Sequence, residues 1–365
     1  MLHALVSAYD VTILTWNPPN FDALDQMFGT SLAGAPIKMQ RPSRVERWLI
    51  DRIPDNCFHQ QANYLLRITK RRGNEFRAVI GCSFECDFGR PGIQYVHYPY
   101  LLQRSGAWRV PGDAPPVARI RGLLSRRLPP WMLISGYSFE RVRSNLTLTN
   151  SRWTLGQIRR QPDADAEVLY PPAPGDFPDV PWEQREDAFA CIGRLEPPKR
   201  QDWIIETLAR VRREWPSLQL HLCGFSSSLD FKRRLDQLAK IHGSWVHIHS
   251  DLSRTDMVKL LSRCRYGIHA YIDEHFGIGP AELARAGCIP FVHASGGQVE
   301  IVDEDPRLCY TTAEDAATKI LAVLRDTALR DGLRKAVSHR SQLFTPQAFV
   351  QGFLGRVSDF LEAQR

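Results

Sequence analysis

The second half of the chain alternates short apolar segments with amphipathic ones, and this order constrains the fold more than any other feature. Parallel strands need a helix-sized crossover between them, so the alternation predicts a parallel sheet wound with helices on both faces. We therefore expect an α/β fold with a Rossmann-like domain over residues 188–345. The expected strands are 188–193, 218–225, 245–250, 266–272 and 289–293, and helices are expected at 229–242, 255–263 and 280–286.

A proline-rich stretch divides the chain. Residues 170–187 hold five prolines among glycine and acidic residues, a composition that resists both helix and strand. Since 365 residues are ample for two cores, we expect a first domain over 1–169, a linker over 170–187 and a second domain over 188–345. The last segment, 346–365, is expected to be a helix that returns to the first domain.

The first domain has a weaker pattern. Residues 1–9 have the character of a helix end, and residues 44–72 carry helical periodicity with a basic end. A short helix is expected at 153–160. Strands are expected at 9–15, 37–41, 79–84 and 94–97, and 144–151 is expected to be the last strand of this domain.

A glycine-bearing loop lies at the start of the helix expected over 280–286. Pro280 suits the first position of a helix, and Gly279 would cap it. A helix N-terminus offers unpaired backbone N–H groups and the positive end of the helix dipole, so it attracts anions. We expect the amides of Phe276–Gly279 to form an anion-binding seat.

Two carboxylates bracket this seat, with seven residues between them. Glu274 lies in the loop and Glu282 near the helix start, so both are expected to face one cleft. A nucleotide sugar needs such a surface, because amides bind its phosphates and carboxylates accept bonds from hydroxyl groups. The alternative is that Glu282 is only a helix-start carboxylate favoured by the dipole.

This stretch reads E-x7-E with an internal FG, followed by GC-x-P and SGG, and it resembles the retaining glycosyltransferases of family 4. The resemblance implies the GT-B fold, with two Rossmann-like, doubly wound domains. It also implies transfer with retention and without a metal, and donor contacts from His275, Phe276, Gly277 and Ile278. In this family a first strand and a glycine-rich loop precede the strand that matches residues 9–15. We therefore expect the first domain to lack its first strand.

A second signature follows the strand at 188–193. Arg194 can fork onto phosphate oxygens, and Lys199 adds a mobile point charge five residues later. The spacing matches the family's GRL-x3-K motif, which implies that Arg194 and Lys199 hold the donor diphosphate. Otherwise they are a solvated arginine and a lysine at a helix start.

His97 ends the strand expected at 94–97, at the edge where open α/β sheets build their sites. The stretch YVHYP resembles family-4 mannosyltransferases that act on lipid-linked oligosaccharides. It implies that His97 faces the transferred sugar, whereas the alternative is a histidine hydrogen-bonded within an aromatic strand end. The same resemblance favours GDP-mannose as donor, a UDP-sugar next, and a glycan or lipid-linked glycan as acceptor.

The net charge of +7 favours an anionic partner without selecting one. Basic residues between tryptophans at 103–133 fit a peripheral membrane contact or an exposed helix-loop. No secretory signal pattern is present and the cysteines lie in apolar contexts, so we expect a cytoplasmic protein with reduced thiols.

The predicted function is a metal-independent, retaining glycosyltransferase. It uses no cofactor, because the nucleotide-diphosphate sugar is its donor substrate. The alternative is a catalytically degenerate protein that binds a nucleotide or nucleic acid on the same fold. Against nucleic acid, the basic residues are not gathered into one stripe and no RNA-binding aromatic signature is present.

Overall fold

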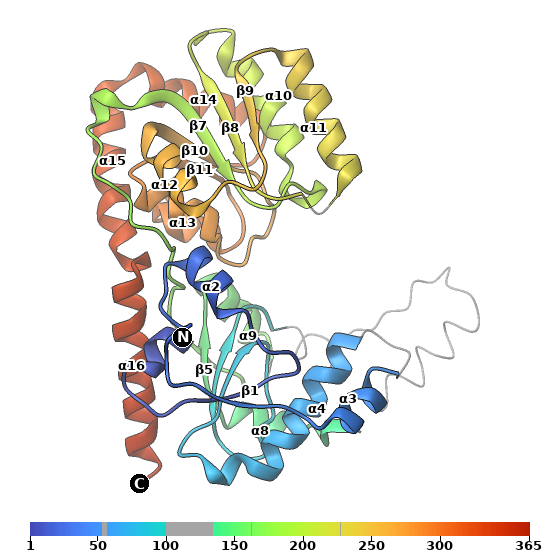
Figure 1. The fold of residues 1–365 in the computed structure, drawn as a ribbon. Coiled ribbons are helices and arrows are strands. Elements are labelled where there is room, and N and C mark those ends of the chain that lie inside the picture. Colours follow the sequence, from blue (N-terminus) through green and yellow to red (C-terminus); the bar gives the residue numbers. More distant parts are fainter. Residues whose placement is uncertain (53–56, 100–133, 162, 227) are drawn as a thin grey trace, which may run out of the picture. The chain divides into compact units, whose positions relative to one another are not determined.

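A computed structural model describes residues 1–52, 57–99, 134–161, 163–226 and 228–365. The chain forms two compact units (Figure 1). Unit 1 comprises Met1–Asp25, Thr30–Leu169 and Val350–Arg365, and unit 2 comprises Gln26–Gly29 and Tyr170–Phe349. The segment expected to be a linker therefore belongs to unit 2, where Ala173 and Trp182 are buried in the core.

Unit 2 contains one parallel six-stranded sheet in the order β12-β11-β10-β7-β8-β9. The order runs outward in both directions from β7, so the direction of winding reverses between β7 and β10. Such a reversal defines a doubly wound sheet. The strands are β7 (Glu186–Ile192), β8 (Gln219–Cys223), β9 (Val246–His249), β10 (Cys264–His269), β11 (Ile289–His293) and β12 (Cys309–Tyr310).

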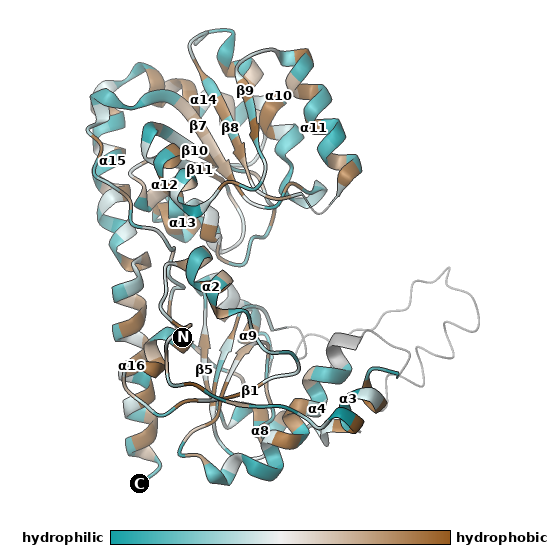
Figure 2. Cartoon of the chain, viewed as in Figure 1, coloured by the Kyte–Doolittle hydropathy of each residue, from teal (hydrophilic) through white to brown (hydrophobic). Residues whose placement is uncertain are grey.

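Helices cover both faces of this sheet because β7 is apolar on both sides. Phe189 and Cys191 pack in the main core, whereas Ala188 and Ala190 pack with a smaller cluster from α12 and α13. In Figure 2, β7 and β8 have hydrophobic colours while α11 is mostly hydrophilic. The helices are α10 (Gln201–Arg212), α11 (Leu229–His242), α12 (Arg254–Arg263), α13 (Ile278–Arg285), α14 (Ala313–Arg325) and α15 (Thr327–Ser341). The 3-10 turns are η2 (Trp182–Gln184), η3 (Pro197–Lys199), η4 (Gly297–Val302) and η5 (Gln342–Phe344).

The start of α13 corrects one prediction. The helix begins at Ile278, so Pro280 is its third residue and Gly279 does not cap it. Gly277 caps it instead, with φ of 99°, a backbone conformation that favours glycine. The proline fits at the third position because helix N–H groups there have no intrahelical partner. Glu282 therefore lies one turn inside the helix rather than in its first turn.

Unit 1 holds two parallel sheets, β1-β2 and β3-β4-β5-β6, whose strands follow the order of the chain. The prediction that residues 144–151 form the last strand is wrong, because β6 pairs with the end of β5. Two residues before a proline-rich stretch are too short to show strand periodicity. The strands are β1 (Thr12–Leu14), β2 (Lys38–Gln40), β3 (Ile80–Ser83), β4 (Ile93–Val96), β5 (Leu146–Thr149) and β6 (Glu167–Val168).

The helical pattern at 44–72 corresponds to two helices, α3 and α4, separated by a turn at Asp51. The last helix, α16 (Pro346–Ala363), runs into unit 1, where Arg356 Nε lies 2.9 Å from Glu167 Oε2. The other helices of unit 1 are α1 (Leu2–Val6), α2 (Phe21–Phe28), α3 (Arg44–Ile50), α4 (Cys57–Arg72), α8 (Phe139–Arg143) and α9 (Arg152–Ile158), with η1 (Gly73–Glu75).

Asp87 connects the loop after β3 to two helices of unit 1. Its side chain is fully buried and accepts bonds from Lys70 Nζ at 2.7 Å and from Arg141 at 2.8 and 2.9 Å. The backbone amides of Gly89 and Ser138 donate to the same carboxylate at 3.0 and 2.7 Å. Burial alone would raise the pKa of Asp87, but these donors outweigh it and lower that pKa.

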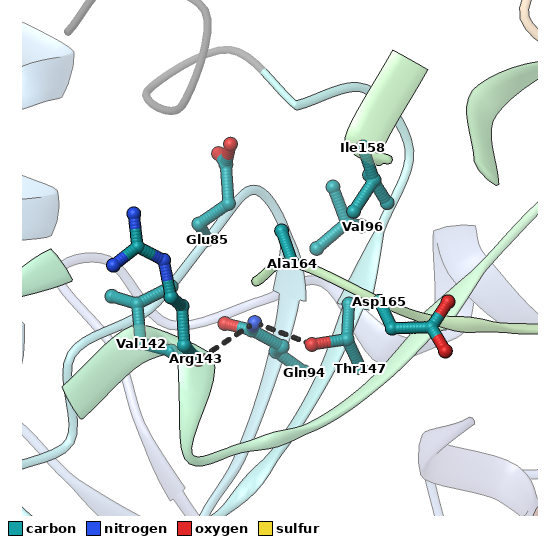
Figure 3. A pocket seen from close by; sticks show the side chains of 9 residues that line it. All are labelled: Glu85, Gln94, Val96, Val142, Arg143, Thr147, Ile158, Ala164 and Asp165. Carbon is teal, nitrogen blue, oxygen red and sulfur yellow. Dashed lines mark hydrogen bonds between the residues drawn. The ribbon is translucent and has the colours of Figure 1, made fainter. Parts of the chain in front are cut away.

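A small cavity near β4 and β5 is lined by polar and apolar residues, among which Gln94 is hydrogen-bonded (Figure 3). Gln94 Nε2 donates to Thr147 Oγ1 at 2.8 Å and to the carbonyl of Val142 at 3.3 Å. The cavity volume is about 20 Å³, enough for a water molecule and far too small for a sugar. It is therefore a feature of the core.

In the part of the chain that the structure describes, no helix is both long and apolar enough to cross a bilayer. The arginine- and tryptophan-bearing segment expected to contact a membrane, 103–133, lies outside the described residues. Cys191, Cys223, Cys264 and Cys288 are free and buried, whereas Cys82 is exposed.

Candidate functional site at the switch point of unit 2

The carboxyl ends of β7 and β10 lie side by side where the winding of the unit 2 sheet reverses. Ligands of open α/β sheets bind outside the carboxyl ends of the strands at such a point. The segment after β7 contains Arg194 and Lys199, and the segment after β10 contains Glu274. The fold thus places both sequence signatures at the edge where a site is expected.

Glycines allow three main-chain segments, after β7, after β8 and at the start of α13, to approach one another closely at this edge of the sheet. A Cβ on Gly224 would overlap the carbonyl oxygen of Gly193, and a Cβ on Gly279 would lie 2.7 Å from the carbonyl oxygen of Ile192. The α13 N-terminus therefore packs directly against the end of β7. The stem of Lys199 lies over Gly193, with Cδ 3.8 Å from the position of a Cβ.

The N-terminus of α13 has the character of an anion seat. Gly277 provides no capping side chain, and Pro280 has no N–H group. Within the described residues, no backbone or side-chain acceptor faces the amides of Ile278 and Gly279. Phe276 is 2% exposed and packs on Tyr170 and Phe344, so its side chain fixes the loop that leads into the seat.

Glu274 is held by two donors on one oxygen. Lys199 Nζ lies 2.6 Å and His269 Nε2 3.2 Å from Oε2. The Glu274 side chain is 16% exposed, and in the described chain neither donor uses Oε1. Glu274 thus has a fixed orientation and a second oxygen available to a hydroxyl group.

The charge of Glu274 is secured by the same contacts. Burial would raise its pKa, but the hydrogen bond from His269 and the charge and hydrogen bond of Lys199 lower that pKa to about 2. Burial also lowers the pKa of His269, so this ring is neutral at pH 7 and donates its Nε2–H. The positive charge beside Glu274 therefore comes from Lys199, whose ammonium group also lies 4.2 Å from the ring centre of Tyr271.

A second loop fixes the backbone around Glu274. The amide of Gly297 donates to the Glu274 carbonyl at 2.6 Å, and the Asp273 amide donates to Ser295 Oγ at 2.8 Å. Gln298, fully buried, donates from Nε2 to the carbonyls of Tyr271 and Ser295 at 2.7 and 3.0 Å. The SGG segment of the sequence motif (residues 295–297) thus holds the backbone of the loop that carries Glu274 through hydrogen bonds.

Glu282 differs from the expectation of an open carboxylate. Its side chain is 5% exposed, and Oε1 lies 2.6 Å from Arg254 Nη1. Burial raises the pKa of Glu282, and the nearby Arg254 counteracts this only in part. Oε2 has no partner among the described residues, so Glu282, like Glu274, binds a cation with one oxygen.

The other residues predicted to bind the sugar donor differ in their exposure and in their contacts with neighbouring side chains. Lys199, expected to be mobile, is 17% exposed and fixed on Glu274, whereas Arg194 is 54% exposed and lies 3.0 Å from Glu196. Lysine has three donors, so Lys199 retains capacity for a phosphate. His275 is half-buried, and burial lowers its pKa. Ile278 is 46% exposed beside the anion seat.

His97 lies in unit 1, directly after β4. Its ring packs edge-on against Tyr95 with centroids 5.2 Å apart, and its Nε2 lies 3.7 Å from Cys82 Sγ. It thus occupies the carboxyl edge of the unit 1 sheet, as expected from its place at the end of the strand.

Sequence reasoning missed His269 and the pairing of Arg254 with Glu282. His269 was counted as part of an apolar strand, although a polar residue at the end of β10 and five residues before Glu274 was an available signal. Arg254 lies at the start of α12, and nothing in its spacing links it to Glu282, 28 residues later.

A larger hollow of unit 2 lies elsewhere. It has a volume of about 510 Å³ and is lined by residues just before β12 and by α15. Its charged groups pair with one another, as Arg307 does with Asp305 at 2.5 Å and Arg340 with Asp303 at 3.6 Å. It lies at the amino end of β12, the opposite edge from the switch point.

The sequence is similar to those of known proteins. Residues 175–340 match the family described as Glycosyl transferases group 1. The chain is 26% identical to the GDP-Man:Man(3)GlcNAc(2)-PP-Dol alpha-1,2-mannosyltransferase of Mus musculus, over 92% of this chain and 69% of the relative. The enzyme of the same name from Homo sapiens is 27% identical, over 59% of this chain and 48% of the relative. The chain thus spans between about half and two thirds of these relatives.

Solved structures agree on the fold. Anabaena HepE in complex with UDP aligns with a TM-score of 0.65 at 15% identity, covering 98% of this chain and 95% of the other. WaaG, a glycosyltransferase involved in lipopolysaccharide biosynthesis, aligns with a TM-score of 0.59 at 16% identity, covering 93% and 89%. At such identities the likeness concerns the fold alone. The chain therefore has the GT-B fold and carries a glycosyltransferase group 1 domain over residues 175–340.

Proposed function

We propose that the protein is a retaining hexosyltransferase that moves a sugar from a nucleotide-diphosphate donor to an acceptor hydroxyl. The observation that carries this proposal is the cluster of Lys199, His269 and Glu274 beside the free amides of α13, at the switch point of unit 2. It joins a fixed cation, backbone donors and an oriented carboxylate, which are the groups that a sugar diphosphate requires.

The residues take distinct roles in this proposal. Arg194, Lys199 and the amides of Ile278 and Gly279 neutralise the diphosphate as it leaves. Glu274 Oε1 accepts a bond from a sugar hydroxyl, and Glu282 Oε2 accepts one from the ribose. His97 contacts the transferred sugar. These assignments combine the geometry of each group with the resemblance to family 4.

Retention would follow from displacement on one face of the sugar. The acceptor oxygen forms a bond to the anomeric carbon while the bond to the departing phosphate oxygen breaks on the same side. The acceptor proton passes to that phosphate oxygen. In this scheme Arg194 and Lys199 supply the positive charge, so no metal ion or cofactor is required. Full transfer in EDTA would support this, and loss that Mg²⁺ or Mn²⁺ restores would contradict it.

We propose GDP-mannose as the donor, with a UDP-sugar next, and a lipid-linked glycan as the acceptor. The support is that the relatives in Mus musculus, Homo sapiens and Dictyostelium discoideum are named for GDP-mannose and a dolichol-linked acceptor. We place the enzyme in the cytoplasm, with peripheral contact at the membrane face. No nucleic acid partner is proposed.

The test is a panel of GDP-, UDP- and ADP-sugars, with release of each nucleotide measured in the presence of glycan and lipid-linked acceptors. Release of GDP from GDP-mannose with transfer to the lipid-linked acceptor is expected. Release of UDP alone would exclude GDP-mannose as the donor, while the assignment as a glycosyltransferase would remain. Nucleotide binding without release from any donor would instead favour a binding protein on the same fold.

A further inference from the structure

Helix α3 of unit 1 is anchored through its polar residues. Ser43 and Glu46 form a capping box, and Glu46 Oε1 also accepts a bond from Tyr64 Oη at 2.7 Å. Just after the helix, Asp51 Oδ1 accepts from Trp16 Nε1 at 3.1 Å and from Gln61 Nε2 at 2.9 Å. The acidic side chains of α3 and its C-cap are therefore occupied by partners within unit 1.

The other face of α3 is apolar and exposed. Val45, Trp48 and Leu49 are 66%, 55% and 54% exposed. Spacings of three and four residues place them on one side of the helix. An exposed valine, tryptophan and leucine side by side form a patch, whereas single exposed apolar residues are ordinary.

Arginines frame this patch. Arg44 and Arg52 are exposed, and the guanidinium carbon of Arg52 lies 3.5 Å from the ring centre of Trp48. In Figure 2, α3 carries both hydrophobic and hydrophilic colours. The outward face thus combines apolar side chains with the guanidinium groups of Arg44 and Arg52. Glu46 and Asp51 keep their negative charge, but their bonded oxygens are directed at their partners within unit 1.

Helix α11 of unit 2 provides a contrast. Leu229 and Ile241 are even more exposed, at 75% and 77%, but they lie at opposite ends of the helix. They form no joint apolar surface, and they serve as matched controls.

We propose that the outward face of α3 docks on a lipid bilayer that contains anionic lipids. Apolar and aromatic side chains enter the boundary between headgroups and acyl chains, and arginines at their edge bind lipid phosphates. A seven-residue helix is too short to span a bilayer, so this is a peripheral contact. The inference rests on the proposed lipid-linked acceptor, because docking would hold unit 1 at the surface where that substrate resides.

The test is flotation of the full chain with vesicles of phosphatidylcholine alone or mixed with phosphatidylglycerol. Trp48→Ser/Leu49→Ser is expected to weaken binding to the anionic vesicles about tenfold or more. Arg44→Gln/Arg52→Gln should weaken it about fivefold per arginine, and added salt should reproduce this loss. The control Leu229→Ser/Ile241→Ser should bind the anionic vesicles as tightly as the unmodified chain does. All variants should have the same Tm as the unmodified chain.

Unchanged vesicle binding in both α3 variants would overturn the proposal. So would a dimer that the Trp48→Ser/Leu49→Ser variant dissociates, because a second copy would then be the occupant. Nucleotide release from soluble donor is measured in parallel. If that release fails in the unmodified chain while vesicle docking through α3 persists, the proposed function is wrong and the docking surface stands.

Discussion

Asp87 in unit 1 and Glu274 in unit 2 are both buried carboxylates bonded to a lysine and a second side chain, yet their surroundings differ. Asp87 is fully buried, and both of its oxygens accept bonds from side chains and backbone amides. Glu274 is 16% exposed and uses only Oε2. A carboxylate with every lone pair occupied holds the fold together, whereas one oriented through a single oxygen is available to a ligand.

The largest expected effect is the loss of stability on removing Asp87, and it tests whether this carboxylate holds the fold together. Asp87→Ala leaves Lys70 partly buried without its counterion, and removes the acceptor for the amides of Gly89 and Ser138. We expect a loss of about 3 kcal/mol in the free energy of unfolding, measured by urea denaturation. A loss below about 1 kcal/mol would show that the cluster is not a structural centre.

Glu274→Gln tests the functional side. The amide keeps the shape and loses the charge, so we expect turnover to fall about a hundredfold, and Tm to fall as well because Lys199 loses its counterion. The matched variant Glu282→Gln should act mainly on KM for the donor, because Glu282 is assigned to the ribose. Unchanged turnover and KM in both variants would contradict the site.

The two glutamates should also respond to pH with opposite sign. The folded chain holds the pKa of Glu274 at about 2, below its ordinary 4.5, so the stability that this carboxylate contributes is complete above pH 4.5 and is lost as pH falls toward 2. Between pH 5 and 3, the stability advantage of the unmodified chain over Glu274→Gln should shrink by about 1–2 kcal/mol.

For Glu282 the pKa is raised, so the folded chain binds the proton more tightly than the unfolded chain does. The stability of the unmodified chain relative to Glu282→Gln should therefore increase as pH falls toward 4.5. Urea denaturation across pH 7 to 3 measures both differences. Parallel trends would show that the two carboxylates do not differ in environment.

The smallest effect concerns Arg141→Lys. Arg141 is 43% exposed, and a lysine replaces its two-pronged contact to Asp87 with a single one. A loss of about 0.5–1 kcal/mol in unfolding free energy is expected, with unchanged turnover. A loss of turnover without a change in stability would assign Asp87 a role in the reaction.

The sequence predicted unit 2 more closely than unit 1 because its signals are local. The helix at 229–242 and the strand at 289–293 coincide with α11 and β11, since periodicity and flanking glycines mark them. Glu274 and Lys199 were found because they lie in motifs that resemble those of family 4. The bond between them was not predicted, because it joins residues 75 positions apart.

Other features leave little trace in a single sequence. The two-residue strand β6 is fixed by pairing with β5 rather than by its own pattern. Asp87 lies in a loop and gathers partners from α4 and α8, so no periodicity reveals it. Burial of Glu282 under an ion pair with Arg254 likewise depends on tertiary packing.

The close approach of main chain at Gly193, Gly224 and Gly279 limits how this site can change. Because even a methyl group at position 224 or 279 would meet a carbonyl oxygen, mutational libraries should yield no functional substitutions there. In the proposed function, new donor preferences should instead arise at exposed positions beside the anion seat such as Ile278, which is 46% exposed. Engineering of the proposed donor site should therefore vary such exposed positions and leave Gly224 and Gly279 unchanged.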